Sequence, residues 1–288
     1  MRDLDDLDLP LVFRGRDAVE AGVLTPRQLR DGRWRRLLHG VYTRRDVEVT
    51  HPLMCEAAGL LLPSSAQVTG PSAATVRGAD WLSPRDPVEA VLPSGGAHPA
   101  IRGVRVRRSS APLVAGTPWR TTTLAVPERM AFDAAARVPL TLAVGRLDEL
   151  VRRGEVSTDR LAAWLEGRHD NDVAAVRTAL DQVDASAESL PESALRVLLR
   201  RAGVHVVPQV VVRHLGRSVA RVDLALPDLR IAIEYDGQWH AAREQLEKDR
   251  ARLNRLREAG WVVVHVTAAD LAEPGRAVAL VRAAMSRR

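Results

Sequence analysis

The stretch that decides the fold is SVARVDLALPDLRIAIEYDGQWH, residues 218–240. On both sides of its Pro-Asp pair, apolar residues alternate with small or polar ones, which is typical of a β-hairpin built around a type I turn. A four-residue loop at 227–230 would pair Leu224 with Ile233 on an apolar face. The pattern therefore predicts two antiparallel strands with one face towards the core.

The other face of this hairpin carries charge. A four-residue loop puts Asp223 opposite Glu234 and Arg221 opposite Asp236, whereas a three-residue loop without a bulge would put the two acids on opposite faces. Carboxylates that face each other repel, and burial makes them costlier. A divalent cation would remove the conflict, because Mg²⁺ binds one or two carboxylates together with water and phosphate oxygens. The alternative is an exposed face that arginines such as Arg221 neutralise.

The segment after the hairpin indicates that this face is covered. In AAREQLEKDRARLNRLREAGW (241–261), leucines recur on one helical face and Gly260 ends the helix. The next residues, WVVVHV (261–266), are almost continuously apolar, as expected for a strand inside a sheet. Residues 187–285 therefore alternate helix, strands, helix, strand and helix, which is an α/β pattern and favours the metal site over a solvated face.

A family motif runs through the same segment. Its residues are Glu234, Asp236, Gly237, His240, Asp249, Arg252, Leu256 and Gly260, followed by the apolar strand. This pattern resembles the domain-of-unknown-function family related to very-short-patch-repair endonucleases, within the PD-(D/E)XK nuclease superfamily. The resemblance covers 187–285 and implies a restriction-endonuclease-like core that cleaves DNA with Mg²⁺ or Mn²⁺. It also implies Asp223 and Glu234 as metal ligands and Glu192 as an auxiliary catalytic acid.

Two of these acids have a second interpretation. The sequence SLPE (189–192) is a capping box, in which Ser189 caps a helix and Glu192 reaches back to its start. Glu192 is therefore expected to cap, to assist the metal, or to do both. Asp236 is expected either as a third metal contact or as the partner of Arg221.

The resemblance has one gap, because the superfamily's lysine would fall where Asp236 stands. Three kinds of group are candidates to replace its charge. His240 has a pKa near neutrality and is a candidate base or activator of water. Lys248 lies two helical turns further along. An arginine such as Arg243 or Arg252 is the third candidate, as a cation that stabilises charge on the phosphate.

Residues 12–45 are predicted to form a small helical unit that ends in a hairpin. Thr25 and Gln28 form a capping box that starts its second helix, and Gly32 ends that helix after barely two turns. A hairpin turning at 39–40 follows. Arginines concentrate on this helix and hairpin, namely Arg27, Arg30, Arg33, Arg35 and Arg36. They suit phosphate contacts beside a major-groove helix, and the alternative is a solvated face on a protein-docking module.

This N-terminal stretch resembles the winged-helix domain of AbiEi-family antitoxins from abortive-infection toxin–antitoxin systems. The similarity continues through TPWRTTTLAVPERMAFDAAA (117–136) and GEVSTDRLAAWL (154–165). It implies a role in phage defence, with DNA and a cognate toxin protein as partners. The middle region otherwise carries little chemistry, and His51 and His98, each beside a proline, are expected in loops.

Composition limits the protein class. The chain has 288 residues, 46% hydrophobic and 27% charged, as expected for a soluble protein of two or three domains. The lone Cys55, the absence of a signal-peptide pattern and the lack of a long apolar run favour the cytoplasm and no membrane partner. The net charge is +6, and all but one of its 42 basic residues are arginines, which permits nucleic-acid binding.

Together these features predict an α+β multidomain protein. It has a winged helix at 1–50, a mixed α/β, antitoxin-like middle region at 51–185, and an endonuclease-like α/β core at 186–288. The predicted function is a metal-dependent DNA endonuclease or nickase targeted by the winged helix. The alternatives are a non-catalytic DNA-binding regulator or antitoxin, and a phage-defence adaptor that acts through protein contacts. No P-loop or dinucleotide fingerprint indicates a nucleotide cofactor.

Overall fold

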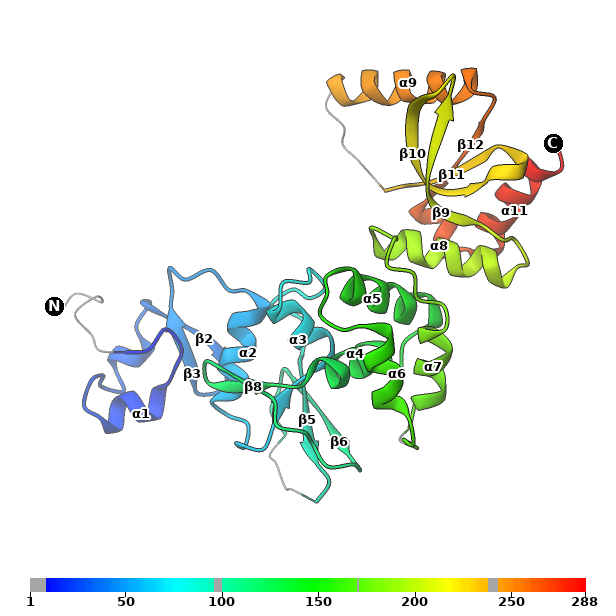
Figure 1. The fold of residues 1–288 in the computed structure, drawn as a ribbon. Helices are drawn as coiled ribbons and strands as arrows, with labels where there is room; N and C mark the ends of the chain where they lie inside the picture. The colour runs from blue at the N-terminus through cyan, green and yellow to red at the C-terminus, as the bar shows by residue number, and fades with distance from the viewer. Residues whose placement is uncertain (1–8, 96–99, 170, 238–242) are drawn as a thin grey trace. The chain divides into compact units, whose positions relative to one another are not determined.

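The computed structural model describes residues 9–95, 100–169, 171–237 and 243–288, with the side chains of 243–249 and 274 outside the description (Figure 1). Its contacts divide the chain into two compact units, Met1–Ala134 with Gly167–Asn171 and Ala135–Glu166 with Asp172–Arg288. The domain boundaries at 50 and 185 stay predictions. Across the described ranges, no helix combines the length and the apolarity that a bilayer crossing requires.

The first unit begins with a small sheet of strand order β1-β3-β2. Its elements are β1 (Phe13–Arg14), α1 (Gly15–Glu20), η2 (Gln28–Arg30), β2 (Trp34–Leu38) and β3 (Val41–Arg44). Phe13 packs edge-on against Trp34, with ring centroids 5.1 Å apart, and both rings are buried. The predicted hairpin that turns at 39–40 is confirmed.

The predicted second helix is wrong in length. Its capping box is present, because Gln28 N donates to Thr25 Oγ1 (3.2 Å) and Thr25 N donates to Gln28 Oε1 (2.8 Å). Only one turn of 3₁₀-helix follows, η2. The Asp31 carboxylate accepts a hydrogen bond from Arg33 N (3.0 Å), and such a side-chain bond gives the backbone an alternative to continuing the helix. A two-turn helix able to fill a major groove is therefore not formed in this stretch.

The rest of the first unit is a five-stranded sheet of order β6-β5-β4-β8-β7. Its strands are β4 (Gln67–Val68), β5 (Val88–Pro93), β6 (Val104–Ser109), β7 (Thr117–Trp119) and β8 (Thr122–Leu124). Three helices accompany it, α2 (His51–Gly59), α3 (Gly70–Val76) and α4 (Pro127–Ala135).

His51 does not lie in a loop, as the neighbouring proline suggested, but opens α2. Thr50 is the N-cap, accepting from Leu53 N at 3.3 Å, and Pro52 stands in the first turn, where its missing N–H has no cost. The buried imidazole has Nε2 2.9 Å from Ser72 Oγ and Nδ1 3.0 Å from Ser83 O. Burial lowers the pKa of His51, so its role is that of a neutral packing residue.

The second unit starts with four helices, α5 (Leu140–Arg152), α6 (Thr158–Leu165), α7 (Val173–Leu180) and α8 (Leu190–Arg201). Ser157 caps α6 by accepting a hydrogen bond from Arg160 N at 3.2 Å. Arg196 of α8 is fully buried and forms an ion pair of 2.6 Å with Asp148 of α5. This pair fixes α8 against the helix that precedes the predicted boundary at 185.

A four-stranded sheet of order β12-β11-β10-β9 follows. Its strands are β9 (Val207–His214), β10 (Arg217–Leu226), β11 (Ile231–Asp236) and β12 (Val262–Thr267), and the helices are α9 (Arg243–Glu258), α10 (Ala268–Ala272) and α11 (Pro274–Met285). The first three strands are antiparallel, and β12 pairs parallel to β11 after the crossover through α9. The register confirms the four-residue loop, since Leu226 pairs with Ile231 and Leu224 with Ile233.

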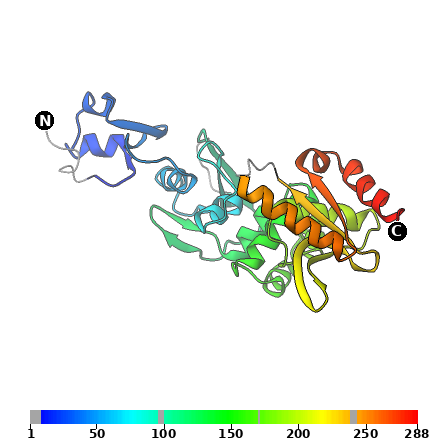
Figure 2. The same cartoon turned by 90° about the horizontal axis from the view of Figure 1, so that it is seen from above.

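Both faces of this sheet are covered. On one face, Leu195 and Leu199 of α8 and Val281 of α11 pack against strand residues such as Leu224 and Ile233. On the other face, Leu256 of α9 packs with Ala225 and Ala232, and Figures 1 and 2 show α9 lying over the strands. The prediction of a single apolar face is therefore too simple, because the face that carries the acids also has an apolar part beneath α9.

Candidate active site

The acids stand where two strands separate. The pairing of β10 with β11 runs from the loop to Leu224 and Ile233, and the next residues in that register are Asp223 and Glu234. Tyr235 N donates to Asp223 Oδ2 at 3.1 Å, so a side chain takes a hydrogen bond that the strand partner would otherwise take. Asp223 and Glu234 therefore lie side by side on one face, as the four-residue loop predicts.

Glu234 is 7% exposed and is paired with Arg252 of α9. Arg252 Nη1 donates to Glu234 Oε2 at 2.7 Å, and Nη2 lies 2.5 Å from Oε1. This second contact has the distance of an ion pair without the angles of a hydrogen bond, which leaves Oε1 buried and without a donor. Arg252 also donates to the backbone carbonyl of Arg221 at 2.8 Å, so it links α9 to two strands.

Of the two interpretations of Asp236, the pairing with Arg221 is wrong, and the metal contact stays a prediction. Arg221 pairs across the sheet with Val211 of β9, and its guanidinium donates to both carboxylate oxygens of Glu188, at 2.6 and 2.7 Å. Asp236 is exposed at the end of β11. Neutralisation of the acidic face therefore comes from Arg252 and not from Arg221.

Asp223 is partly buried among other acids. Burial, followed by the charge of Glu192, raises the pKa of Asp223 to about 6, and the charge of Glu234 adds to this. The hydrogen bond from Tyr235 N and the charge of Arg252 act in the opposite direction. Asp223, Glu192 and Glu234 therefore behave as one cluster in which the ionised forms oppose one another.

Glu192 forms the predicted cap and also lies near Asp223, while its assistance to a metal stays a prediction. As the capping box predicts, Ser189 Oγ accepts from Glu192 N at 3.3 Å and donates to Glu192 Oε1 at 2.9 Å. Glu188 N donates to Oε2 at 3.0 Å, so the carboxylate satisfies the start of α8. The same carboxylate lies near enough to Asp223 to raise its pKa.

No pattern in the sequence pointed to Gln209. It stands on β9 between the partners of Val222 and Leu224, and therefore opposite Asp223. Its Nε2 donates to Glu192 Oε2 at 3.0 Å. Its φ of 52° is left-handed, a conformation that costs a non-glycine residue about 1–3 kcal/mol and persists only where the surroundings impose it.

The position of Gln209 completes a polar row across the sheet. Glu234 pairs with His265 of β12, so the row runs Gln209, Asp223, Glu234, His265 over four strands. The alternation of apolar and polar residues shows which side chains share a face within one strand. Which residues of neighbouring strands lie next to one another depends on the register, so this row could not be predicted without it.

Three predicted groups lie partly or wholly outside the described structure. His240 is outside the described residues. Lys248 and Arg243 lie on α9, but their side chains are not described. Of the candidate replacements for the missing lysine, Arg252 is therefore the one whose contacts with the acids are defined.

The carboxylate oxygens of Asp223 and Glu234 are of the chemical type that binds a hard divalent cation. Carboxylate oxygens are the ligands that Mg²⁺ prefers, and it usually takes one or two of them with water and phosphate oxygens. The acid–acid opposition at Asp223 is a feature that a cation would relieve, whereas Glu234 already has the Arg252 guanidinium beside both of its oxygens. Among the described residues, no three His, Cys, Asp or Glu side chains converge as a complete metal-binding group. Asp223 and Glu234 would thus hold an ion only together with water or substrate oxygens.

The N-terminal arginines are not equivalent. Arg27, Arg30, Arg35 and Arg36 are exposed. Arg33 is half-buried and donates to the Asp31 carboxylate through Nε (2.8 Å) and Nη2 (2.6 Å), so it holds the turn that ends η2.

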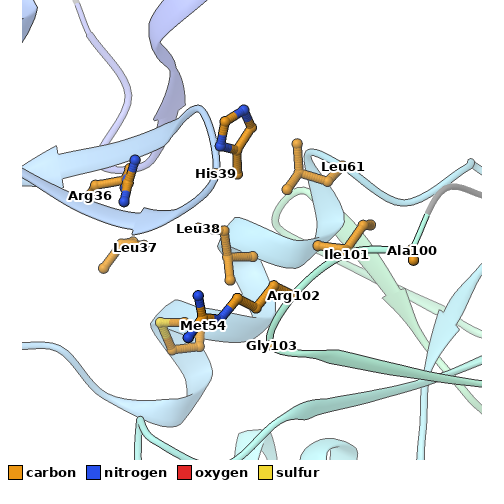
Figure 3. A pocket seen from close by; sticks show the side chains of 10 residues that line it. All are labelled: Arg36, Leu37, Leu38, His39, Met54, Leu61, Ala100, Ile101, Arg102 and Gly103. Atoms are coloured by element: carbon orange, nitrogen blue, oxygen red, sulfur yellow. The ribbon is translucent and has the colours of Figure 1, made fainter.

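A pocket of about 880 Å³ lies beside the β2–β3 turn and α2 in the first unit (Figure 3). Its lining residues are Arg36, Leu37, Leu38, His39, Met54, Leu61, Ala100, Ile101, Arg102 and Gly103. Two arginines and one histidine are thus among the lining residues, and the others are apolar residues and a glycine. Among the described residues, this lining contains no carboxylate, serine or cysteine, so the acid row is the candidate site that we consider further.

Comparison with known proteins finds similar proteins, but their names state no function. No family model matches the chain. It is 27% identical over 263 residues to Uncharacterized protein Rv2248 and to Uncharacterized protein MT2308, both from Mycobacterium tuberculosis, covering 88% of this chain and 92% of each relative. Among solved structures, the crystal structure of the RV2827C protein from Mycobacterium tuberculosis has a TM-score of 0.43 and 22% identity, covering 60% of this chain and 72% of that one.

Proposed function

We propose that the C-terminal sheet carries the active site of a metal-dependent DNA endonuclease or nickase that uses Mg²⁺ or Mn²⁺. The observation that supports this most is the meeting of Asp223 and Glu234 on one face, with Glu192 close by, at the point where two strands separate. The order of elements around the sheet, α8-β9-β10-β11-α9-β12, is compatible with the restriction-endonuclease-like core that the sequence resemblance implies.

The proposed roles follow from the contacts. A bound divalent ion would polarise the scissile phosphate and lower the pKa of a water molecule. Asp223 and Glu234 would bind that ion. Arg252, already beside Glu234, would place its guanidinium against the negative charge of the phosphate in place of the missing lysine. His240 stays the proposed base.

The N-terminal unit would bind the DNA backbone. The four exposed arginines at the start of η2, within η2 and on β2 suit phosphate contacts, which position a protein on DNA without reading its sequence. Because η2 is a single turn, this surface is better suited to backbone contact than to reading bases in the major groove. A cognate toxin protein is the alternative occupant of the same surface.

A second function is favoured by the Glu234–Arg252 pair. With an arginine paired to it in the folded chain, Glu234 does not need a metal to be neutralised. Together with the missing lysine, this supports a non-catalytic DNA-binding regulator or antitoxin of an abortive-infection type toxin–antitoxin system, built on a nuclease-like sheet.

A plasmid assay separates the two functions. Supercoiled plasmid is incubated with the full chain and Mn²⁺ or Mg²⁺, beside Asp223→Asn, Glu234→Gln and the control Asp228→Asn. Asp228 is an exposed acid on the loop of the same hairpin. A nuclease should nick with the wild type and the control, and at least about 100-fold more slowly with the two site variants. If all four proteins nick equally, or if none nicks any of several DNA forms, the nuclease function is excluded and the regulator function stands.

A further inference from the structure

Gln209 is unusual among the residues of the sheet. Six non-glycine residues in the described ranges have a left-handed φ, and five of them stand at turns or helix ends, namely Arg120, Arg137, Asp172, Leu215 and Arg230. Gln209 alone among them lies inside a strand, with ladder partners on both sides. A left-handed residue interrupts the regular alternation of side chains along a strand, so it changes the direction in which that side chain leaves the backbone.

The altered direction lets Gln209 meet a helix. Its amide donates to Glu192 Oε2 at 3.0 Å, although Glu192 already has two donors at the start of α8, from Ser189 and Glu188. The cap is therefore complete without Gln209. The extra hydrogen bond joins the carboxylate of Glu192 to the strand beside Asp223.

The cap holds Glu192 at the start of α8, and the bond from Gln209 adds a second restraint that opposes the repulsion between Glu192 and Asp223. Both groups are carboxylates, and like charges at short range repel. An arginine or lysine at position 209 would hold Glu192 but would also compete with a cation for it. The neutral amide of glutamine donates a hydrogen bond without adding positive charge, which is the property needed beside a cation site.

We propose that Gln209 is a positioning residue, whose amide holds the Glu192 carboxylate in the acid cluster so that it supports the binding of a divalent cation. This inference rests on the proposed nuclease function. It adds an outer contact to the site, and outer contacts of this kind orient ligands and typically change metal affinity by about 10- to 100-fold.

The test compares variants that separate backbone strain from the hydrogen bond. Gln209→Gly relieves the left-handed φ and removes the donor, Gln209→Met keeps the length without the donor, and Gln209→Asn keeps an amide in a residue that tolerates this φ. For each full-length protein, Mn²⁺ affinity is measured by calorimetry, together with the melting temperature and the kcat and KM(Mn²⁺) of plasmid nicking.

Positioning and packing roles give different results. If Gln209 positions Glu192, the Gly variant should melt at or above the wild-type temperature yet bind Mn²⁺ about tenfold more weakly, with Asn between the two. In a Glu192→Gln background, Gln209→Met should add no further loss. If the Gly and Met variants fold and bind Mn²⁺ with wild-type affinity, the role of Gln209 is overturned, but the proposed function is not. A wild-type chain that bound no Mn²⁺ would overturn the proposed function and this role with it.

Discussion

Replacing Asp223 by asparagine should stabilise the metal-free protein at neutral pH. Burial and the charge of Glu192 raise the pKa of Asp223 from 3.8 to about 6. Each pKa unit corresponds to about 1.4 kcal/mol, so the full shift amounts to roughly 3 kcal/mol. Because the side chain is only partly buried, screening by water reduces this to about 1–2 kcal/mol. Asparagine keeps an oxygen to accept from Tyr235 N, so the local hydrogen bond survives.

The sign of the pH dependence follows from where the proton binds more tightly. Between about pH 4 and 6 the folded chain holds a proton on Asp223 that the unfolded chain releases, so stability falls as the pH rises. The loss is complete above about pH 6 and absent well below pH 4. Asp223→Asn removes this titration, so its advantage over the wild type should grow from pH 4 to pH 7 and then level off.

Thermal unfolding with a chelator present measures this directly. At pH 7.5 the variant should melt about 2–8 °C above the wild type, since 1 kcal/mol corresponds to about 2–4 °C in a protein of this size class. Added Mn²⁺ should raise the melting temperature of the wild type but not of Asp223→Asn. Asp228→Asn is the matched control and should show neither effect. A variant that melts below the wild type at pH 7.5 would refute the reasoning, because Asp223 would then stabilise the fold.

Two further predictions concern arginines. Arg252→Met should destabilise the protein by roughly 2 kcal/mol in urea unfolding, because it leaves the buried Glu234 without its cation, and adding Glu234→Gln should recover much of this loss. Arg27→Ala with Arg30→Ala should weaken DNA binding and reduce the slope of log K against log salt concentration by about 2, as for two lost phosphate contacts.

Each arginine prediction has a control on the same element or beside it. Arg255→Met lies on the exposed side of α9 and should leave stability unchanged. Arg33→Ala should lower the melting temperature more than it changes the salt slope, because Arg33 is engaged by Asp31. An unchanged slope in the Arg27/Arg30 double variant would remove the DNA assignment of the N-terminal unit. Full stability of Arg252→Met would show that Glu234 is hydrated rather than paired.

The central hairpin was predictable because local chemistry determines it. The Pro-Asp pair sets the loop length, the loop length sets the register, and the register puts Asp223 beside Glu234. The helix and apolar strand that follow were visible from periodicity. These features depend on neighbours within a few residues of one another along the chain.

The partners of the acids were not predictable, because they depend on how distant elements dock. Arg252 is 18 residues beyond Glu234, and which helical residue meets the strand depends on the placement of α9. The hydrogen bond of Gln209 to Glu192 needs both the register and a left-handed φ, and no residue pattern announces the latter.

Two wrong predictions of local structure have causes that can be found in the sequence. The helix after Thr25 is short because Asp31 captures the backbone N–H of Arg33, and an aspartate two residues before an arginine was available as a signal. His51 was expected in a loop because a proline follows it. The cap at Thr50, with Pro52 in the first helical turn, would have indicated a helix start instead.

The buried contact between α5 and α8 affects how the C-terminal sheet can be isolated. A shortened polypeptide starting near residue 186 would keep Arg196 and lack Asp148. The buried guanidinium group would then have no counter-ion. Such a fragment should express poorly or aggregate whatever its enzymology. Recombinant versions meant for soaking or titration should therefore begin ahead of Leu140.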